Sequence, residues 1–282
     1  MFANLSTGSI GVSATLEEII QLAAAIGYGG VDINLDEAEE FGLGRTKGLL
    51  RENNLKLGGW GLPVEFRQDE DTFKDTLAEL PQKASIAHEL GLTRCNTWVP
   101  SGSNERTYQE QFDLLANRFC HCAEILWDHG CYLGLEFLGP KTILAGFKHE
   151  GISNMADMLK LCSAAGTGNL GLLLDCWHWY TSGGTIAEIE ALDPQQVVYV
   201  HVNDAPVGIP IEEHIHNECA LPMETGVIDL PAFLKALNKI GYDGPITAEP
   251  LVPGLADMEP QVACQTIADC LKKGWDAAGL EW

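Results

Sequence analysis

The sequence predicts an α/β fold in which eight strand-then-helix units close into a single (β/α)8 barrel over residues 1–282. First, short apolar runs alternate along the chain with longer helical patterns, which is typical of a parallel sheet. Second, the length suits such a barrel, which needs ~250 residues. Third, polar residues of metal-binding types end four successive apolar runs. An open, doubly wound sheet is the alternative, but no glycine-rich phosphate-binding motif follows an expected strand.

The first four units each pair an apolar run with a helical pattern, and the helices of the first, third and fourth units stop at Gly27, Gly91 and Gly130. Thr15 and Glu18 are spaced as a capping box, and Gly27 is placed as a helix C-cap. The expected strands are residues 2–6, 30–33, 55–60 and 93–99, and the expected helices are residues 16–25, 46–53, 72–90 and 108–129.

The last four units carry the candidate metal ligands. Glu136 ends the run 133–135, Asp175 ends 172–174, His201 ends 197–200, and Glu249 follows 245–248. The gaps between them are 39, 26 and 48 residues, near the ~30 or more that one βαβ step needs. Parallel barrel strands end on one rim, so we expect all four side chains at the C-terminal face, where barrel active sites lie. The expected helices of these units are residues 153–165, 186–191, 230–240 and 261–277.

Composition excludes several classes of function. A net charge of −23 repels phosphate backbones and anionic membranes, so we expect no nucleic-acid and no membrane partner. The first residues contain neither a basic segment nor a long apolar stretch, so no signal peptide is expected. Nine scattered cysteines without CxxC pairs indicate free thiols in a reducing compartment, which predicts a cytoplasmic protein.

Three carboxylates and one imidazole at one rim predict a site for one divalent metal ion. A lone carboxylate at a strand end is usually a loop hydrogen-bonder or a helix cap, but buried charges have to be paired or to bind metals. Hard oxygen ligands with one imidazole favour Mn²⁺ or Mg²⁺, with Co²⁺, Zn²⁺ and Fe²⁺ as alternatives. Glu136 and Glu249, from different strands, would then supply two acid/base groups.

Several polar and aromatic residues near the same rim are candidate substrate contacts. His178 follows Asp175 by three residues, and Asn203 follows His201 by two. Trp60 and Trp98 end expected strands, where they would either pack the loops or line the substrate pocket. Residues 141–151 and 206–225 are long for such connections and are expected to cover the substrate; the second segment contains His216.

Five segments resemble the xylose isomerase-like TIM-barrel superfamily, and its sugar phosphate isomerase/epimerase group in particular. They are Glu136-Phe-Leu-Gly-Pro, Asp175-Cys-Trp-His-Trp, His201-Val-Asn-Asp, Leu221-Pro-Met-Glu-Thr-Gly-Val-Ile-Asp and Gly241-Tyr-Asp-Gly-Pro-Ile-Thr-Ala-Glu-Pro. The resemblance implies that Glu136, Asp175, His201 and Glu249 bind the metal, that Glu136 and Glu249 also transfer protons, and that His178 contacts substrate.

The resemblance implies a metal-dependent isomerase or epimerase of a keto-sugar or related polyol, with proton transfer through a metal-held enediolate. The alternative is a metal-dependent lyase, either inosose dehydratase-like or a subunit that cleaves C-glycosides. A homo-oligomer is compatible with either. Many relatives carry a substrate-binding arginine where this chain has Asn217-Glu-Cys-Ala. Lys141 or Arg45 could replace this arginine; the alternative is that both side chains are simply solvated at the surface. Without the arginine, we expect a neutral substrate rather than a phosphorylated one.

Overall fold

Nine of the described strands form one parallel sheet that closes into a ring. The structure, a computed structural model, describes residues 1–252 and 254–282. The order across the sheet is β3 (Lys56–Leu57), β2 (Gly30–Val31), β1 (Phe2–Leu5), β11 (Pro245–Ala248), β10 (Val197–Val202), β9 (Leu170–Asp175), β7 (Tyr132–Phe137), β5 (Arg94–Val99) and β4 (Trp60–Gly61). The outermost strands, β3 and β4, are consecutive pieces of one segment, so the ring closes through residues 56–61.

The break between β3 and β4 corrects the expectation of one continuous strand over residues 55–60. Gly58 and Gly59 separate the two pieces. A Cβ atom at Gly58 would clash with the side chains of Asp32 and Asn4, and one at Gly59 would clash with Tyr199. The strand therefore lacks side chains where residues from other strands cross the barrel interior.

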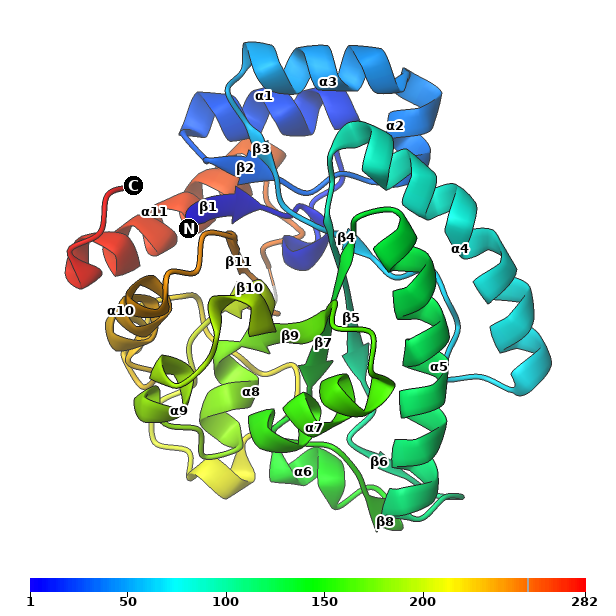
Figure 1. Ribbon diagram of the computed structural model, residues 1–282. Helices are drawn as coiled ribbons and strands as arrows, with labels where there is room; N and C mark the ends of the chain where they lie inside the picture. The colour runs from blue at the N-terminus through cyan, green and yellow to red at the C-terminus, as the bar shows by residue number, and fades with distance from the viewer. Residues whose placement is uncertain (253) are drawn as a thin grey trace.

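Helices surround the strands (Figure 1). They are α1 (Leu16–Ile26), α2 (Leu35–Phe41), α3 (Leu43–Glu52), α4 (Glu70–Leu90), α5 (Tyr108–Asp128), α6 (Lys141–Leu144), α7 (Met155–Ala165), α8 (Cys176–Thr181), α9 (Ile186–Glu190), α10 (Leu230–Ile240) and α11 (Pro260–Ala278). The capping box of Thr15 and Glu18 is confirmed, and Gly27 ends α1 with a φ of +98°. Helices α2, α6 and α8 were not expected; Asn34 caps α2 through the backbone N–H groups of Asp36 and Glu37.

Several short elements lie outside the barrel strands. β6 (Gly102–Ser103) pairs antiparallel with β8 (His149–Glu150), and three 3₁₀ turns cover Gly8–Ile10 (η1), Pro194–Gln196 (η2) and Ile211–Glu213 (η3). The two segments expected to cover substrate lie against each other, because Thr142 donates a hydrogen bond of 2.7 Å to the backbone carbonyl of His214.

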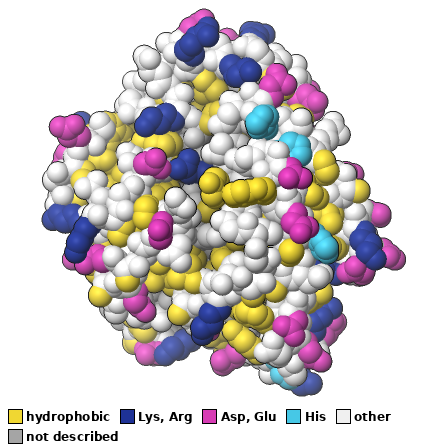
Figure 2. Space-filling view, in the orientation of Figure 1, with side chains coloured by type: hydrophobic (Ala, Val, Ile, Leu, Met, Phe, Trp, Pro, Cys, Tyr) yellow, Lys and Arg dark blue, Asp and Glu magenta, His cyan; other side chains and the backbone are white. Residues whose placement is uncertain are grey.

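One hydrophobic core includes residues from Ala3 to Ala278, and β10 is buried along its whole length. The assignment of residues 1–282 to a single domain stays a prediction. All nine cysteines are free, as expected. No helix among the described residues has the length and apolar composition needed to cross a membrane. On the face shown in Figure 2, Lys and Arg side chains are scattered among acidic and apolar ones.

Candidate metal centre

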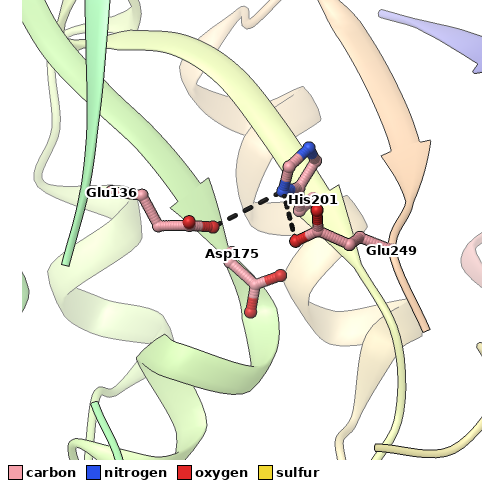
Figure 3. Close-up of side chains that lie close together, drawn as sticks. All are labelled: Glu136, Asp175, His201 and Glu249. Carbon is pink, nitrogen blue, oxygen red and sulfur yellow. Dashed lines mark ion pairs between the residues drawn. The ribbon is translucent and has the colours of Figure 1, made fainter. Parts of the chain in front are cut away.

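The four candidate ligands come together at the C-terminal ends of neighbouring strands. Glu136 lies in β7, Asp175 ends β9, His201 lies in β10 and Glu249 directly follows β11. His201 is in register with Asp175 on one side and with Thr247 on the other. Each of the four residues offers one ligand atom, and these atoms all lie within 4.8 Å of one another. In Figure 3, Glu136 and Glu249 approach the His201 ring from opposite sides.

The spacing of these atoms suits a single cation. His201 Nδ1 lies 3.4 Å from Glu136 Oε1 and 3.0 Å from Glu249 Oε2. Ligands held at ~2.0–2.3 Å around one ion are roughly 3–4.5 Å apart. Glu136 Oε1 and His201 Nδ1 are buried and have no hydrogen bond of acceptable geometry among the described residues. Buried polar atoms without partners are costly, and a cation at their common focus would satisfy them.

The charges of the cluster are strongly coupled. Burial, and then the charge of Glu249, raise the pKa of Glu136. Burial and Glu136 raise the pKa of Asp175 well above its usual range. Burial alone would lower the pKa of His201, but Glu249 and Glu136 raise it well above 6.5. Burial likewise opposes ionisation of Glu249, whose pKa His201 nevertheless lowers. A divalent cation would relieve the repulsion between the carboxylates, so the residues present fit such an ion.

Three hydrogen-bond donors orient the carboxylate of Asp175. Its Oδ1 atom accepts hydrogen bonds from the N–H groups of Trp177 (2.7 Å) and His178 (2.9 Å) and so caps α8. Asn203 Nδ2 donates to Asp175 Oδ2 (3.3 Å) and to the backbone carbonyl of Glu249 (3.2 Å). Asn203 therefore connects two of the candidate ligands and is placed to position them; its contact with substrate stays a prediction.

The two histidines proposed as substrate contacts lie beside the cluster. The rings of His178 and His216 are 5.6 Å apart. Burial lowers the pKa of His178 well below its usual value. Its Nδ1 accepts a hydrogen bond of 3.2 Å from the Gly139 N–H, which puts the ring proton on Nε2. The Nε2–H group is then available to donate to a substrate oxygen.

Trp98 is in register with Glu136 on the neighbouring strand, whereas the basic candidates Lys141 and Arg45 are exposed. Trp98 is 46% exposed and stacks under the Arg67 guanidinium, whose carbon is 3.9 Å from the ring centroid. Lys141 is exposed, and its Nζ lies 3.5 Å from Glu212 Oε1. Arg45 pairs with Glu17 at 3.2 Å. Surface solvation is the interpretation that this structure favours for both Lys141 and Arg45.

A cavity of about 570 Å³ opens beside the cluster and contains residues that the sequence analysis did not single out. His201, Glu249 and Trp60 line it, together with Asp32 and Asn96. Asp32 directly follows β2, so the same strand-end rule could have identified it. Asn96 lies within β5, where no sequence pattern distinguishes a residue that faces the cavity.

Known proteins that resemble this chain include inosose isomerases and 3-dehydroshikimate dehydratases. The inosose isomerase of Halalkalibacterium halodurans is 24% identical over 253 residues, which cover 86% of this chain and 85% of that protein. The chain spans only 37% of the length of the Pseudomonas aeruginosa dehydratase.

Several solved structures share the fold over nearly the whole chain. A xylose isomerase domain protein from Alicyclobacillus acidocaldarius superposes with a TM-score of 0.84 and 28% identity, covering 96% of this chain and 97% of that one. The IOLI protein, solved with a bound zinc atom, superposes with a TM-score of 0.81 and 19% identity, covering 99% and 98%. The family profile described as xylose isomerase-like TIM barrel matches residues 20–273. This chain belongs to the xylose isomerase-like TIM-barrel family.

Proposed function

We propose that this protein is a divalent-metal-dependent isomerase or epimerase of a keto-sugar or related polyol. The observation that carries the proposal is the cluster of three carboxylates and one imidazole, whose ligand atoms lie within 4.8 Å beside an open cavity. The similarity to inosose isomerases over most of both chains supports an isomerase of a small polyol-like substrate.

Glu136, Asp175, His201 and Glu249 would hold the ion, with Mn²⁺ as the first choice among oxygen-preferring metals. Zn²⁺ is the alternative that the zinc-bound IOLI structure supports. When bound, the ion would polarise a substrate carbonyl and stabilise the negative charge that develops when the adjacent carbon loses a proton.

Glu136 and Glu249 are proposed as the proton-transfer pair. They come from β7 and from the residue after β11, and they flank His201 from opposite sides (Figure 3). One carboxylate can therefore remove a proton from one face of a substrate carbon, and the other can return a proton from the other face or to the neighbouring carbon. Return to the same carbon is epimerisation, and return to the neighbour is isomerisation.

His178 and Trp60 are proposed to complete the substrate site. The neutral His178 ring offers an Nε2–H donor, and Trp60 offers a buried aromatic wall to the cavity that also contains His201 and Glu249. An apolar wall strengthens the electrostatic interactions of the reacting groups because it excludes water.

The test is incubation of the metal-loaded protein with an inosose, D-fructose and L-ribulose in D₂O. The proposal predicts deuterium on carbon next to the carbonyl, with the substrate mass otherwise conserved. Glu249→Gln should abolish this exchange, whereas Glu52→Gln, at the exposed end of α3, should not change it. Loss of water or of an aglycone would instead establish the lyase alternative. If no member of the panel exchanges or reacts, the proposal is wrong for these substrates.

A further inference from the structure

The cavity beside the candidate metal has a polar wall that the proposed proton transfer does not use. His201 and Glu249 line one part of it. The rest includes hydroxyl and amide side chains and the carboxyl groups of Asp32 and Glu37, together with apolar residues, from elements that supply no metal ligand. Among the described residues that line this cavity, none is Lys or Arg.

Asp32 is held rigidly at this wall. Its Oδ1 atom accepts hydrogen bonds from Asn4 Nδ2 (2.9 Å) and from the Gly59 N–H (2.7 Å), and its Oδ2 accepts one from Tyr199 Oη (2.7 Å). Tyr199 Oη and Asn4 Nδ2 are each within 2.9 Å of Thr247 Oγ1. A carboxylate oxygen can accept two hydrogen bonds, so Oδ2 retains a free acceptor position.

Asn96 supplies complementary donors. Its backbone carbonyl accepts a hydrogen bond of 2.9 Å from the Leu62 N–H, but its carboxamide has no hydrogen-bond partner among the described residues. A side chain at Gly59 would clash with the Asn96 amide, so the glycine leaves that amide its place in the cavity. Trp60 adds one more donor, because its indole Nε1 is buried without a partner.

Donors and acceptors mixed in this way match hydroxyl groups, each of which donates one hydrogen bond and accepts others. They match a phosphate poorly, because a phosphate at this wall would lie beside the carboxyl groups of Asp32 and Glu37, and no Lys or Arg among the described lining residues would neutralise it there. The wall therefore favours a neutral polyhydroxylated molecule.

We propose that Asn96 and Asp32 are specificity-determining residues that bind the hydroxyl groups of a neutral polyol or ketose on the side away from the candidate metal. This inference rests on the proposed function for the identity of the substrate class. It assigns a subsite to residues that contribute neither metal ligands nor proton-transfer groups.

The test is calorimetric titration of the Mn²⁺-loaded protein with myo-inositol, an unreactive neutral polyol. Asn96→Ala is the main variant, since it removes an amide without a protein partner and should fold. Loss of one or two hydrogen bonds to neutral hydroxyls predicts binding about threefold to tenfold weaker. Asn117→Ala, at an exposed position of α5, is the matched control and should bind as the wild type does.

Asp32→Asn is a second variant and should also bind myo-inositol more weakly. Its folding is checked by circular dichroism, because all present partners of Asp32 donate hydrogen bonds to the carboxylate and at least one would meet an NH₂ group instead. Titration with inositol 1-phosphate should show at least tenfold weaker binding to the wild type than myo-inositol. Failure of the wild type to bind myo-inositol, unchanged binding in Asn96→Ala, or tighter binding of the phosphate would each overturn the inference.

Two parallel measurements distinguish a failure of the subsite inference from a failure of the proposed function. Mn²⁺ titration of Asn96→Ala should match the wild type, so a loss of polyol binding cannot be attributed to loss of the ion. Deuterium exchange tests the reaction itself. Absent exchange with Asn96-dependent myo-inositol binding would contradict the proposed function alone, and exchange with binding independent of Asn96 would contradict the subsite alone.

Discussion

Asp204 holds the long segment that follows β10 in place through hydrogen bonds to its backbone. Replacement of Asp204 should therefore strongly destabilise the folded protein. The side chain is fully buried and accepts four backbone hydrogen bonds. Oδ1 accepts from Ala205 (2.8 Å) and Ile228 (3.0 Å), and Oδ2 accepts from Thr225 (3.0 Å) and Gly226 (2.7 Å). These hydrogen bonds show that Asp204 caps the loop.

Asp204→Asn keeps the size of the side chain but replaces one oxygen with an NH₂ group. In either orientation of the amide, two backbone N–H groups lose their acceptor and face another donor. At ~1–3 kcal/mol for each buried unsatisfied group, the free energy of unfolding should fall by about 2–6 kcal/mol. That is a large part of the ~5–15 kcal/mol that stabilises a typical protein.

Equilibrium urea unfolding measures this difference, and hydrogen exchange at residues 225, 226 and 228 locates it. Asp128→Asn, at the exposed end of α5, is the matched control and should change stability by less than ~0.5 kcal/mol. If Asp204→Asn costs less than ~1 kcal/mol and the three amides keep their protection, the assigned role of the carboxylate is wrong.

Three further predictions concern the site. Glu136→Gln and Glu249→Gln should each lower kcat by at least ~10²–10⁴ without unfolding the protein; a variant that keeps most of the wild-type rate would show that its carboxylate is not an acid/base group. Asn203→Ala should weaken Mn²⁺ binding by ~10–100-fold, because it removes the amide that connects Asp175 and Glu249; unchanged affinity in a metal titration would assign Asn203 another role. Saturating substrate analogue should slow hydrogen exchange in residues 141–151 and 206–225, and equal exchange with and without the analogue would argue against a covering role.

The strand-end rule was sufficient to predict which four side chains meet. Parallel barrel strands end on one rim, so Glu136, Asp175, His201 and Glu249 could be brought together without knowing any side-chain contact. The capping box at Thr15 was equally accessible, because its hydrogen bonds join residues three positions apart.

Contacts between distant parts of the chain could not be predicted from such local patterns. The break at Gly58 and Gly59 depends on side chains such as Asn4 and Tyr199, which lie far away in sequence and cross the barrel interior. The stacking of Trp98 with Arg67 is another such contact, because the two residues lie on different segments of the chain. Asn96 could not have been chosen over its neighbours, because only the closed barrel shows which β5 side chain faces the cavity.

The central claim is that the cluster at the rim holds one divalent cation. Metal-stripped protein should be titrated with Mn²⁺, with free ion followed by electron paramagnetic resonance and bound ion by elemental analysis after dialysis. We predict one equivalent bound per chain in the wild type and in Glu52→Gln, and none in Asp175→Ala or His201→Ala at the same free concentration. Absence of Mn²⁺ and Zn²⁺ uptake by the wild type, or one equivalent retained in both ligand variants, would contradict the account.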